Sequence, residues 1–270
     1  PKLYLDNPLG VFELDFEENL GIVRQCVKYK KRIIFPSTSE VYGMCPDAAF
    51  DEETSSLVLG PIHKGRWIYA CSKQLLDRVI WTYGQQGNLE FTLIRPFNWI
   101  GPRLDSLETA KEGSSRVVTQ FIASLVCRDP IILVDGGSQS RSFTYIDDGI
   151  DAIMKIIENE HGKASGKIFN IGNPANNCTI KDLAARLLSM FKNHPLHRND
   201  GIYSEIIVQN ADAYYGRSYQ DMQTRVPNIE KARNELGWNP KIGLDEALKR
   251  TLDSFLEEVD RAGTCTQGRH

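Results

Sequence analysis

The sequence predicts an α/β fold, with a doubly wound parallel sheet and a smaller C-terminal lobe. Segments with helical periodicity alternate with short apolar runs, as in successive βα units. Small polar residues follow the apolar runs, where folds of this kind place their sites. No G-x-G-x-x-G turn occurs, although a Rossmann-like sheet opens with one to seat a pyrophosphate. We therefore expect a Rossmann-like fold whose first βαβ unit is absent from these residues.

The first unit is predicted between Asn7 and Glu40. Its helix follows from the near-helical spacing of six apolar residues, Val11, Leu14, Phe16, Leu20, Val23 and Val27. The run KRIIFPSTSE then predicts a buried strand that ends in hydroxyl side chains.

The second unit repeats this order. A helix is predicted from Tyr69 to Tyr83, with Leu75, Leu76, Val79 and Ile80 on one face. The strand FTLIRPF begins at Phe91 and is broken by Pro96. Two consecutive helix-strand pairs indicate parallel βα units.

The remaining elements follow from the same patterns. Strands are predicted at IILVDGG from Ile131 and at KIFNIGNP, and the stretch after His194 is expected to be rich in loops. Helices are expected at Ser115 to Val126, at Tyr145 to Glu158 with Thr144 as its cap, at Lys181 to Met190, at Ile229 to Leu236 and at Leu244 to Val259. We assign residues 1–100 and about 144–172 to the dinucleotide-binding domain, and about 101–143 and 173–270 to the substrate-binding lobe.

The composition limits the classes of partner. The 270 residues are 41% hydrophobic and 25% charged, with a formal net charge of −3, so nothing draws the chain as a whole to nucleic acid or anionic membrane. No stretch approaches the length of a membrane span. Six cysteines show neither a C-x-x-C pair nor metal-ligand spacing, which predicts no metal site and a reducing, cytoplasmic location.

Tyr69 and Lys73 are the first candidates for chemistry. Positions four apart share a helix face, so the lysine ammonium can lie near the phenol and a bound cofactor. A neighbouring positive charge lowers a tyrosine pKa, so the pair is a candidate base for a sugar hydroxyl. Tyrosine and lysine at this spacing also occur on ordinary solvated helices.

Further polar residues stand where one site would need them. Thr38, Ser39 and Glu40 end the preceding strand, and Asn98 follows the strand containing Arg95. The alternative is a polar turn with Glu40 in solvent.

Together these motifs resemble the extended short-chain dehydrogenase family of UDP-sugar enzymes, over nearly the whole chain. STSEVYG, YACSK, RPFNWIGPR and DGGSQSRSFTYIDD follow in the family's order and at its intervals. Ser39 stands where the dehydratases carry an aspartate, and simple epimerases lack Glu40. The Ser-Glu pair resembles the UDP-glucuronic acid decarboxylase group. The stretches Arg66 to Tyr69 and Arg95 to Trp99 are most similar to the C-terminal dehydrogenase/decarboxylase domain of bifunctional polymyxin-resistance proteins of the ArnA type.

The resemblance implies NAD as cofactor and UDP-glucuronic acid as substrate. Tyr69 and Lys73 would serve the oxidation and contact the cofactor, Thr38 and Ser39 would hold the sugar, and Glu40 would accept a proton. Arg225 matches the family's proton donor, but a guanidinium pKa above about 12 favours carboxylate binding or enolate stabilisation. The implied substrate contacts are Tyr4, Thr38, Ser39, Arg66, Asn98, Ile132, Arg141 and Tyr219, with Arg141 suited to bidentate phosphate pairing.

The expected product is a UDP-4-keto-pentose with NADH and carbon dioxide, on the route to UDP-4-amino-4-deoxy-L-arabinose for lipid A modification and polymyxin resistance. One alternative is a UDP-xylose or UDP-apiose synthase that reduces the keto intermediate again. Another is a non-catalytic binding member of the fold, which the presence of Glu40, Tyr69, Lys73 and Arg225 disfavours. The resemblance also implies a homo-oligomer, and a formyltransferase domain precedes this one in the bifunctional members.

Overall fold

The computed structural model describes residues 2–196 and 203–262. Cys265, the last of the six cysteines considered in the sequence analysis, lies outside these ranges. Its strands are β1 (Ile33–Pro36), β2 (Phe91–Pro96), β3 (Trp99–Ile100), β4 (Ile131–Val134), β5 (Ser140–Ser142), β6 (Thr144–Tyr145), β7 (Lys167–Ile171), β8 (Asn177–Thr179) and β9 (Ile206–Gln209). The α-helices are α1 (Lys2–Asp6), α2 (Pro8–Phe12), α3 (Asn19–Lys28), α4 (Trp67–Gln85), α5 (Leu107–Lys111), α6 (Val117–Cys127), α7 (Ile146–Glu158), α8 (Ile180–Lys192), α9 (Ala211–Tyr215), α10 (Glu230–Leu236) and α11 (Leu244–Ala262).

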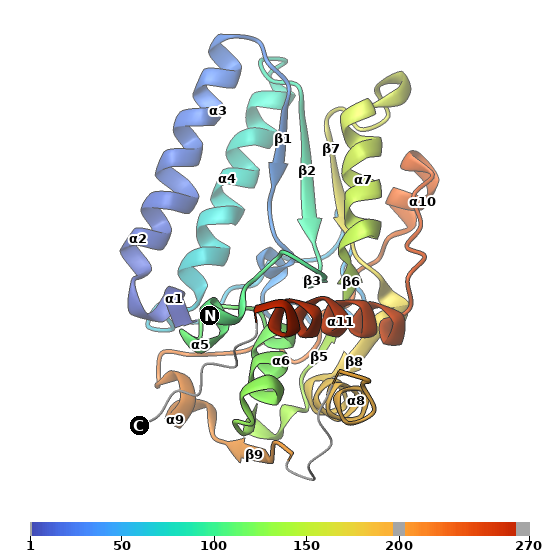
Figure 1. The fold of residues 1–270 in the computed structure, drawn as a ribbon. Coiled ribbons are helices and arrows are strands. Elements are labelled where there is room, and N and C mark those ends of the chain that lie inside the picture. The colour runs from blue at the N-terminus through green and yellow to red at the C-terminus, as the bar shows by residue number, and fades with distance from the viewer. Residues whose placement is uncertain (1, 197–202, 263–270) are drawn as a thin grey trace.

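A parallel sheet in the order β1-β2-β7 forms one half of the molecule (Figure 1). Helices α3 and α4 cover one face, where Val23, Leu76 and Ile80 pack with Phe35 and Leu93. Helices α7 and α10 cover the other face. Because helices lie on both faces of a parallel sheet, the predicted doubly wound α/β class is confirmed.

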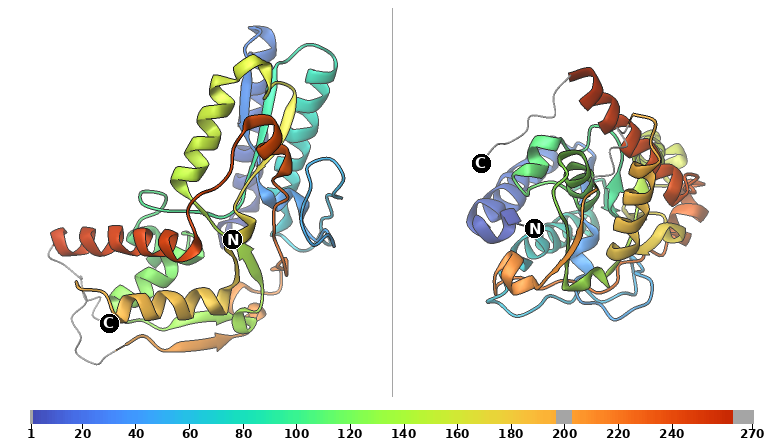
Figure 2. Two further views of the ribbon diagram at one scale, coloured as in Figure 1. Left: turned by 90° about the vertical axis from the view of Figure 1, so that its right-hand side faces the viewer. Right: turned by 60° about the horizontal axis from the view of Figure 1, so that its bottom comes forward.

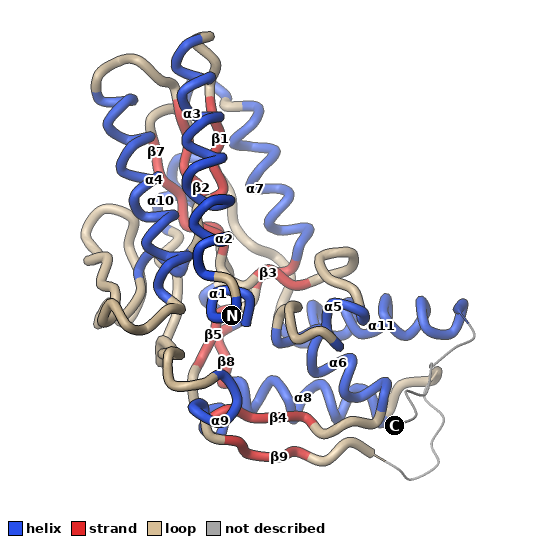
Figure 3. The backbone as a smooth tube through the Cα atoms, turned by 90° about the vertical axis from the view of Figure 1, so that its left-hand side faces the viewer, coloured by secondary structure: helices blue, strands red, loops and turns tan. Residues whose placement is uncertain are grey.

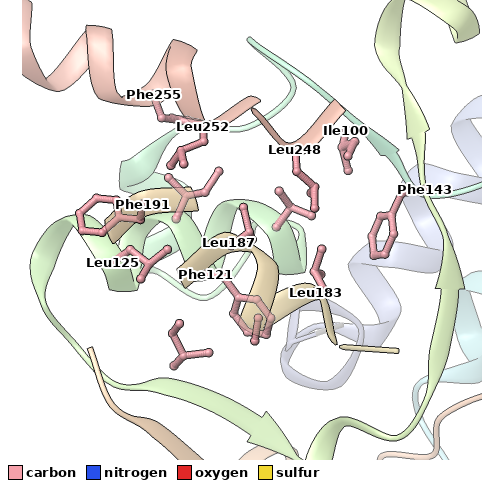
Figure 4. Packing of buried hydrophobic residues seen from close by; sticks show 14 of the residues in the cluster. Ile100, Phe121, Leu125, Phe143, Leu183, Leu187, Phe191, Leu248, Leu252 and Phe255 are labelled. Carbon is pink, nitrogen blue, oxygen red and sulfur yellow. The ribbon is translucent and has the colours of Figure 1, made fainter. Parts of the chain in front are cut away.

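The second half is a lobe beneath the C-terminal ends of the strands, in which α8 and α11 run across the direction of the sheet helices (Figure 2). Its core is a separate apolar cluster from α6, α8, α11 and β4, seen closely in Figure 4. Phe121, Leu183, Leu187 and Leu252 meet there, and Phe143 and Ile100 close the side toward the sheet. Two short ladders border this lobe, parallel β4 with β9 and antiparallel β5 with β8.

The local predictions differ from the structure in several places. The helix expected from Asn7 to Lys28 is divided, because residues Glu13–Glu18 form a π-helical turn (η1) between α2 and α3. Thr144 does not cap α7; it lies in β6, and its hydroxyl donates to the carbonyl of Phe97. Strand β9 arises in the stretch expected to be loops, where its half-exposed side chains show no alternation.

Helix α10 lies on the sheet, although residues 173–270 were assigned to the lobe. Ala232 of α10 packs with Phe169 and Ile171 of β7, together with Ile229 and Trp238 on either side of the helix, because these apolar side chains would otherwise be exposed. The chain thus returns from the lobe to the sheet before α11. None of the helices within residues 2–196 and 203–262 is long and apolar enough to cross a membrane.

Candidate active site

The site begins at the end of β1, where the chain turns into a short 3₁₀ helix, η2 (Ser39–Tyr42). Thr38 caps this turn, since its hydroxyl accepts the backbone N–H of Glu40 at 3.2 Å. Gly43 closes the turn with φ of 56°, and a Cβ there would lie 2.0 Å from the carbonyl oxygen of Val58. The turn holds Ser39 and Glu40 beneath the sheet in a fixed orientation.

Helix α4 brings Tyr69 and Lys73 to the same end of the sheet. The Lys73 ammonium lies 3.4 Å from the carbonyl oxygen of Pro36, the last residue of β1, and 5.8 Å from the centre of the Tyr69 ring. The Tyr69 ring is stacked at 4.8 Å on the ring of Tyr4 from α1. Figure 3 shows α1 at the junction between the two halves of the molecule.

The pKa of Tyr69 is raised in this structure, although the neighbouring Lys73 was expected to lower it. Burial raises that pKa, and the negative charges of Glu40 and Asp15 raise it further. Lys73 instead forms an ion pair with Asp15, Nζ to Oδ1 at 3.1 Å. Asp15 was not among the predicted site residues. It lies in the π-helical turn η1, a type of distortion that often marks functional positions but leaves no trace in hydrophobic periodicity.

Two arginines from distant segments hold the Glu40 carboxylate. Arg66 lies immediately before α4, with Nη1 at 3.5 Å from Oε2, and Arg225 has Nη1 at 3.6 Å from Oε1. Arg225 Nη1 also donates to Ser39 Oγ at 3.2 Å. Burial alone raises the pKa of Glu40, but Arg66 and Arg225 outweigh burial and hold the pKa below its ordinary value. Glu40 is therefore ionised at neutral pH.

The Arg225 guanidinium is more acidic than a solvated one. Burial, and then the positive charge of Arg141, lowers its pKa to about 10. A guanidinium with this pKa is still protonated at neutral pH, which agrees with the role in carboxylate binding or enolate stabilisation expected from the sequence.

Asp221 is a second charged residue that the sequence interpretation missed. Its Oδ1 accepts from Arg141 Nη2 at 2.7 Å and lies 3.5 Å from Arg66 Nη2. Arg141 Nη1 donates to the carbonyl oxygens of Ser140 and Met222, at 2.8 and 2.9 Å. These bonds fix the guanidinium of Arg141 at the cavity wall and leave its Nε and one hydrogen of Nη2 for a phosphate.

A cavity of about 580 Å³ joins these groups, between the strand ends and the lobe. The predicted site residues that line it are Tyr4, Thr38, Ser39, Glu40, Arg66, Tyr69, Asn98, Ile132, Arg141, Tyr219 and Arg225. Lys73 does not line the cavity; it lies buried against Pro36 and Asp15. Asn98 donates from Nδ2 to the Ser142 carbonyl at 3.0 Å, and Tyr219 is stacked at 4.1 Å on Tyr215, an aromatic residue that the predictions omitted.

The cavity can receive the reactive end of a dinucleotide, because Tyr69 borders it and Lys73 lies within 3.4 Å of the end of β1. The glycine-rich turn that would hold the pyrophosphate does not occur in the sequence. No group of three or more His, Cys, Asp or Glu side chains in the described ranges could hold a metal ion.

Comparison with known proteins relates this chain to one enzyme family and to solved structures with the same fold. The model of the family described as NAD dependent epimerase/dehydratase matches residues 1–172. The solved structure of the PbgP3 protein from Burkholderia pseudomallei is 53% identical, with a TM-score of 0.81, and the match covers 96% of this chain and 74% of that one.

More distant solved structures share the fold. The UDP-glucose 4-epimerase of Thermotoga maritima, solved with UDP-glucose, is 21% identical with a TM-score of 0.75, over 95% of this chain and 74% of that one. The dTDP-glucose 4,6-dehydratase of Bacillus anthracis, in complex with NAD, is 19% identical with a TM-score of 0.73, over 92% of this chain and 69% of that one.

Proposed function

The chain belongs to the NAD-dependent epimerase/dehydratase family, and from this premise we propose that it catalyses the oxidative decarboxylation of UDP-glucuronic acid. The products are a UDP-4-keto-pentose, carbon dioxide and NADH. The observation that carries the proposal is the buried Glu40 carboxylate between Arg66 and Arg225, beside Ser39. A dehydratase-like proton donor is absent from position 39, and two guanidinium groups can receive a sugar carboxylate there.

The oxidation begins at the 4-hydroxyl of the sugar. Tyr69 takes the hydroxyl proton in its phenolate form, which burial and the negative charges of Glu40 and Asp15 disfavour in the unliganded site. Tyr69 and Lys73 would contact NAD, which would supply the hydride acceptor for the oxidation of this carbon to a ketone. Thr38 and Ser39 orient the sugar. The positive charge of Lys73, 5.8 Å from the centre of the Tyr69 ring, favours the phenolate.

Decarboxylation follows because the new ketone lies β to the carboxylate. The bond between C5 and the carboxyl carbon breaks, carbon dioxide leaves, and its electron pair becomes an enolate. Arg225 and Arg66 bind the carboxylate and then stabilise the enolate charge. One proton is added at C5, which balances the proton removed from the 4-hydroxyl. Arg225 and the ionised Glu40 lie 3.6 Å apart beside Ser39, at the end of the cavity where this proton would be transferred.

The test is to incubate the purified protein with NAD and UDP-glucuronic acid and to measure NADH by absorbance and carbon dioxide by capture. The proposal predicts equal amounts of the two products. Carbon dioxide without accumulating NADH would favour a synthase that reduces the keto intermediate again. Neither product, from protein that binds NAD, would refute the proposal and favour the non-catalytic alternative.

The finer context of this activity is part of the same proposal. Supply of a keto-pentose for UDP-4-amino-4-deoxy-L-arabinose and lipid A modification rests on the sequence resemblance, supported by 53% identity to the PbgP3 protein. A cytoplasmic location and a homo-oligomer remain proposals on the same basis.

A further inference from the structure

Asp221 lies between two arginines of the cavity, Arg66 and Arg141. We propose that Asp221 is a positioning residue that holds Arg66 and Arg141 for a ligand with two separate anionic groups, a diphosphate at Arg141 and a sugar carboxylate at Arg66 and Arg225. This inference rests on the proposed function and deepens it. A single carboxylate, Asp221, would position the arginines that bind both anionic groups of the substrate.

The contacts of Asp221 join elements that are distant in the sequence. Its Oδ1 accepts from Arg141 of β5 at 2.7 Å and lies 3.5 Å from Arg66, which precedes α4 on the sheet. The same oxygen accepts the backbone N–H of Met222 at 2.8 Å, which fixes its rotamer. One oxygen atom thus sets the separation of two guanidinium groups from different halves of the molecule.

The negative charge of Asp221 offsets the repulsion between buried arginines. Arg66, Arg141 and Arg225 are all buried, and the charges of Arg141 and Arg66 both act to lower the pKa of Arg225. Such mutual repulsion would drive the arginines apart without a counter-charge between them. Glu40 separates Arg225 from Arg66, and Asp221 separates Arg66 from Arg141.

The cluster still has unused capacity for an anion. Three guanidinium groups face two carboxylates, which leaves one positive charge in excess. Among the described groups, Arg66 Nε and Arg225 Nε are buried without a hydrogen-bond partner. Arg66 Nη1 and Glu40 Oε2 also lack a hydrogen bond, but they face each other as an ion pair at 3.5 Å. Buried donors without a partner need an explanation, and an anion bound in the cavity would supply one.

Asp221 is held too firmly to act only as a competitor that leaves when the ligand arrives. The segment 219–221 forms a wall between the main cavity and a smaller one of about 230 Å³. Lys64 Nζ donates to the carbonyls of Arg217 and Tyr219 at 2.6 and 3.2 Å, and Trp67 Nε1 donates to Gln220 Oε1 at 2.9 Å. These bonds tie the wall to the start of α4, so Asp221 stays in place while the arginines bind the ligand.

The experiment measures binding of UDP, UDP-glucose and UDP-glucuronic acid by titration calorimetry to the wild-type protein and to Asp221→Asn. Asparagine keeps the shape but removes the charge. We expect UDP affinity to fall by at least about tenfold, the scale for breaking a buried charge pair. The preference for UDP-glucuronic acid over UDP-glucose should also decrease, because Arg66 loses its fixed position. A purely structural role would not change that preference in folded protein.

Asp212→Asn is the matched control, since Asp212 lines only the smaller cavity, and its affinities should equal those of the wild type. If Asp221→Asn does not fold, Asp221→Glu decides, because it keeps the charge but displaces it by one methylene. Its preference for UDP-glucuronic acid should then be reduced while UDP still binds.

Unchanged affinities and preference in folded Asp221→Asn would overturn the inference alone. Tighter UDP binding by that variant would also overturn it, because Asp221 would then be a competitor of the ligand. Failure of the wild type to bind any of the three nucleotides would overturn the proposed function as well.

Discussion

Replacing Glu40 by glutamine tests the centre of the proposed site. The change keeps the size of the side chain and removes the charge between Arg66 and Arg225. Loss of a positioned proton-transfer group typically slows a reaction by about 100- to 10,000-fold, or about 3 to 5 kcal/mol of barrier. We therefore expect decarboxylation to fall into this range while UDP still binds through Arg141.

The same change should destabilise the fold by a limited amount. Two unit charges 3.5 Å apart attract by about 5 kcal/mol at an effective dielectric constant of about 20. The cost of desolvating the charges cancels much of this, and breaking a buried pair costs about 3 to 5 kcal/mol. Arg66 retains Asp221 and Arg225 retains Ser39, so we expect about 3 kcal/mol. This is within the stability of an ordinary domain.

The stability difference should depend on pH in a defined direction. The pKa of Glu40 is lower in the folded state than in the unfolded state, so its stabilisation is present above the unfolded value. That stabilisation is lost as the pH falls through the folded value. The melting temperatures of wild type and Glu40→Gln should therefore differ most near neutral pH and converge in acid.

The assay compares initial rates of NADH formation and melting curves for the two proteins. Glu53→Gln is the control, because Glu53 is exposed and forms an ion pair with Lys231 at 2.5 Å, away from the cavity. It should keep the wild-type rate. If Glu40→Gln retained more than about a tenth of the rate, the assigned role of Glu40 in proton transfer would be wrong.

Two further substitutions test contacts that the structure shows, one of Asp15 near Tyr69 and one of Trp238 beside α10. Asp15→Asn removes a negative charge that raises the pKa of Tyr69, so the rise of the oxidation rate with pH should move to lower pH; an unchanged profile would show that Asp15 does not influence Tyr69. Trp238→Phe removes the indole N–H bond to the Asp148 carbonyl, 2.9 Å long and fully buried, and leaves a small void. Urea unfolding should show a loss of about 2 to 4 kcal/mol, and a loss below about 0.5 kcal/mol would contradict the packing of α10 on the sheet.

The sequence by itself determined the fold class and most elements around the sheet. Apolar runs and helical periodicity located β1, β2, β7, α4 and α7. The buried face of each element consists of apolar residues that recur with the period of a helix or a strand, so the sequence alone reveals it. The strand-end residues Thr38, Ser39 and Glu40 and the helix residue Tyr69 were predicted to share a site, since parallel strands end at one edge. The structure places all four on one cavity.

Only the tertiary structure decided which charges face one another. Arg225 meets Ser39 across 186 positions, and Asp221 meets Arg66 across 155. No local pattern reports such pairs, because periodicity shows the face on which a residue lies but not the remote side chain opposite it. The pKa of Tyr69 likewise depends on burial and then on the charges of Glu40 and Asp15, which come from other segments. Burial and charge in the assembled fold, and not spacing along the chain, set the ionisation of this site.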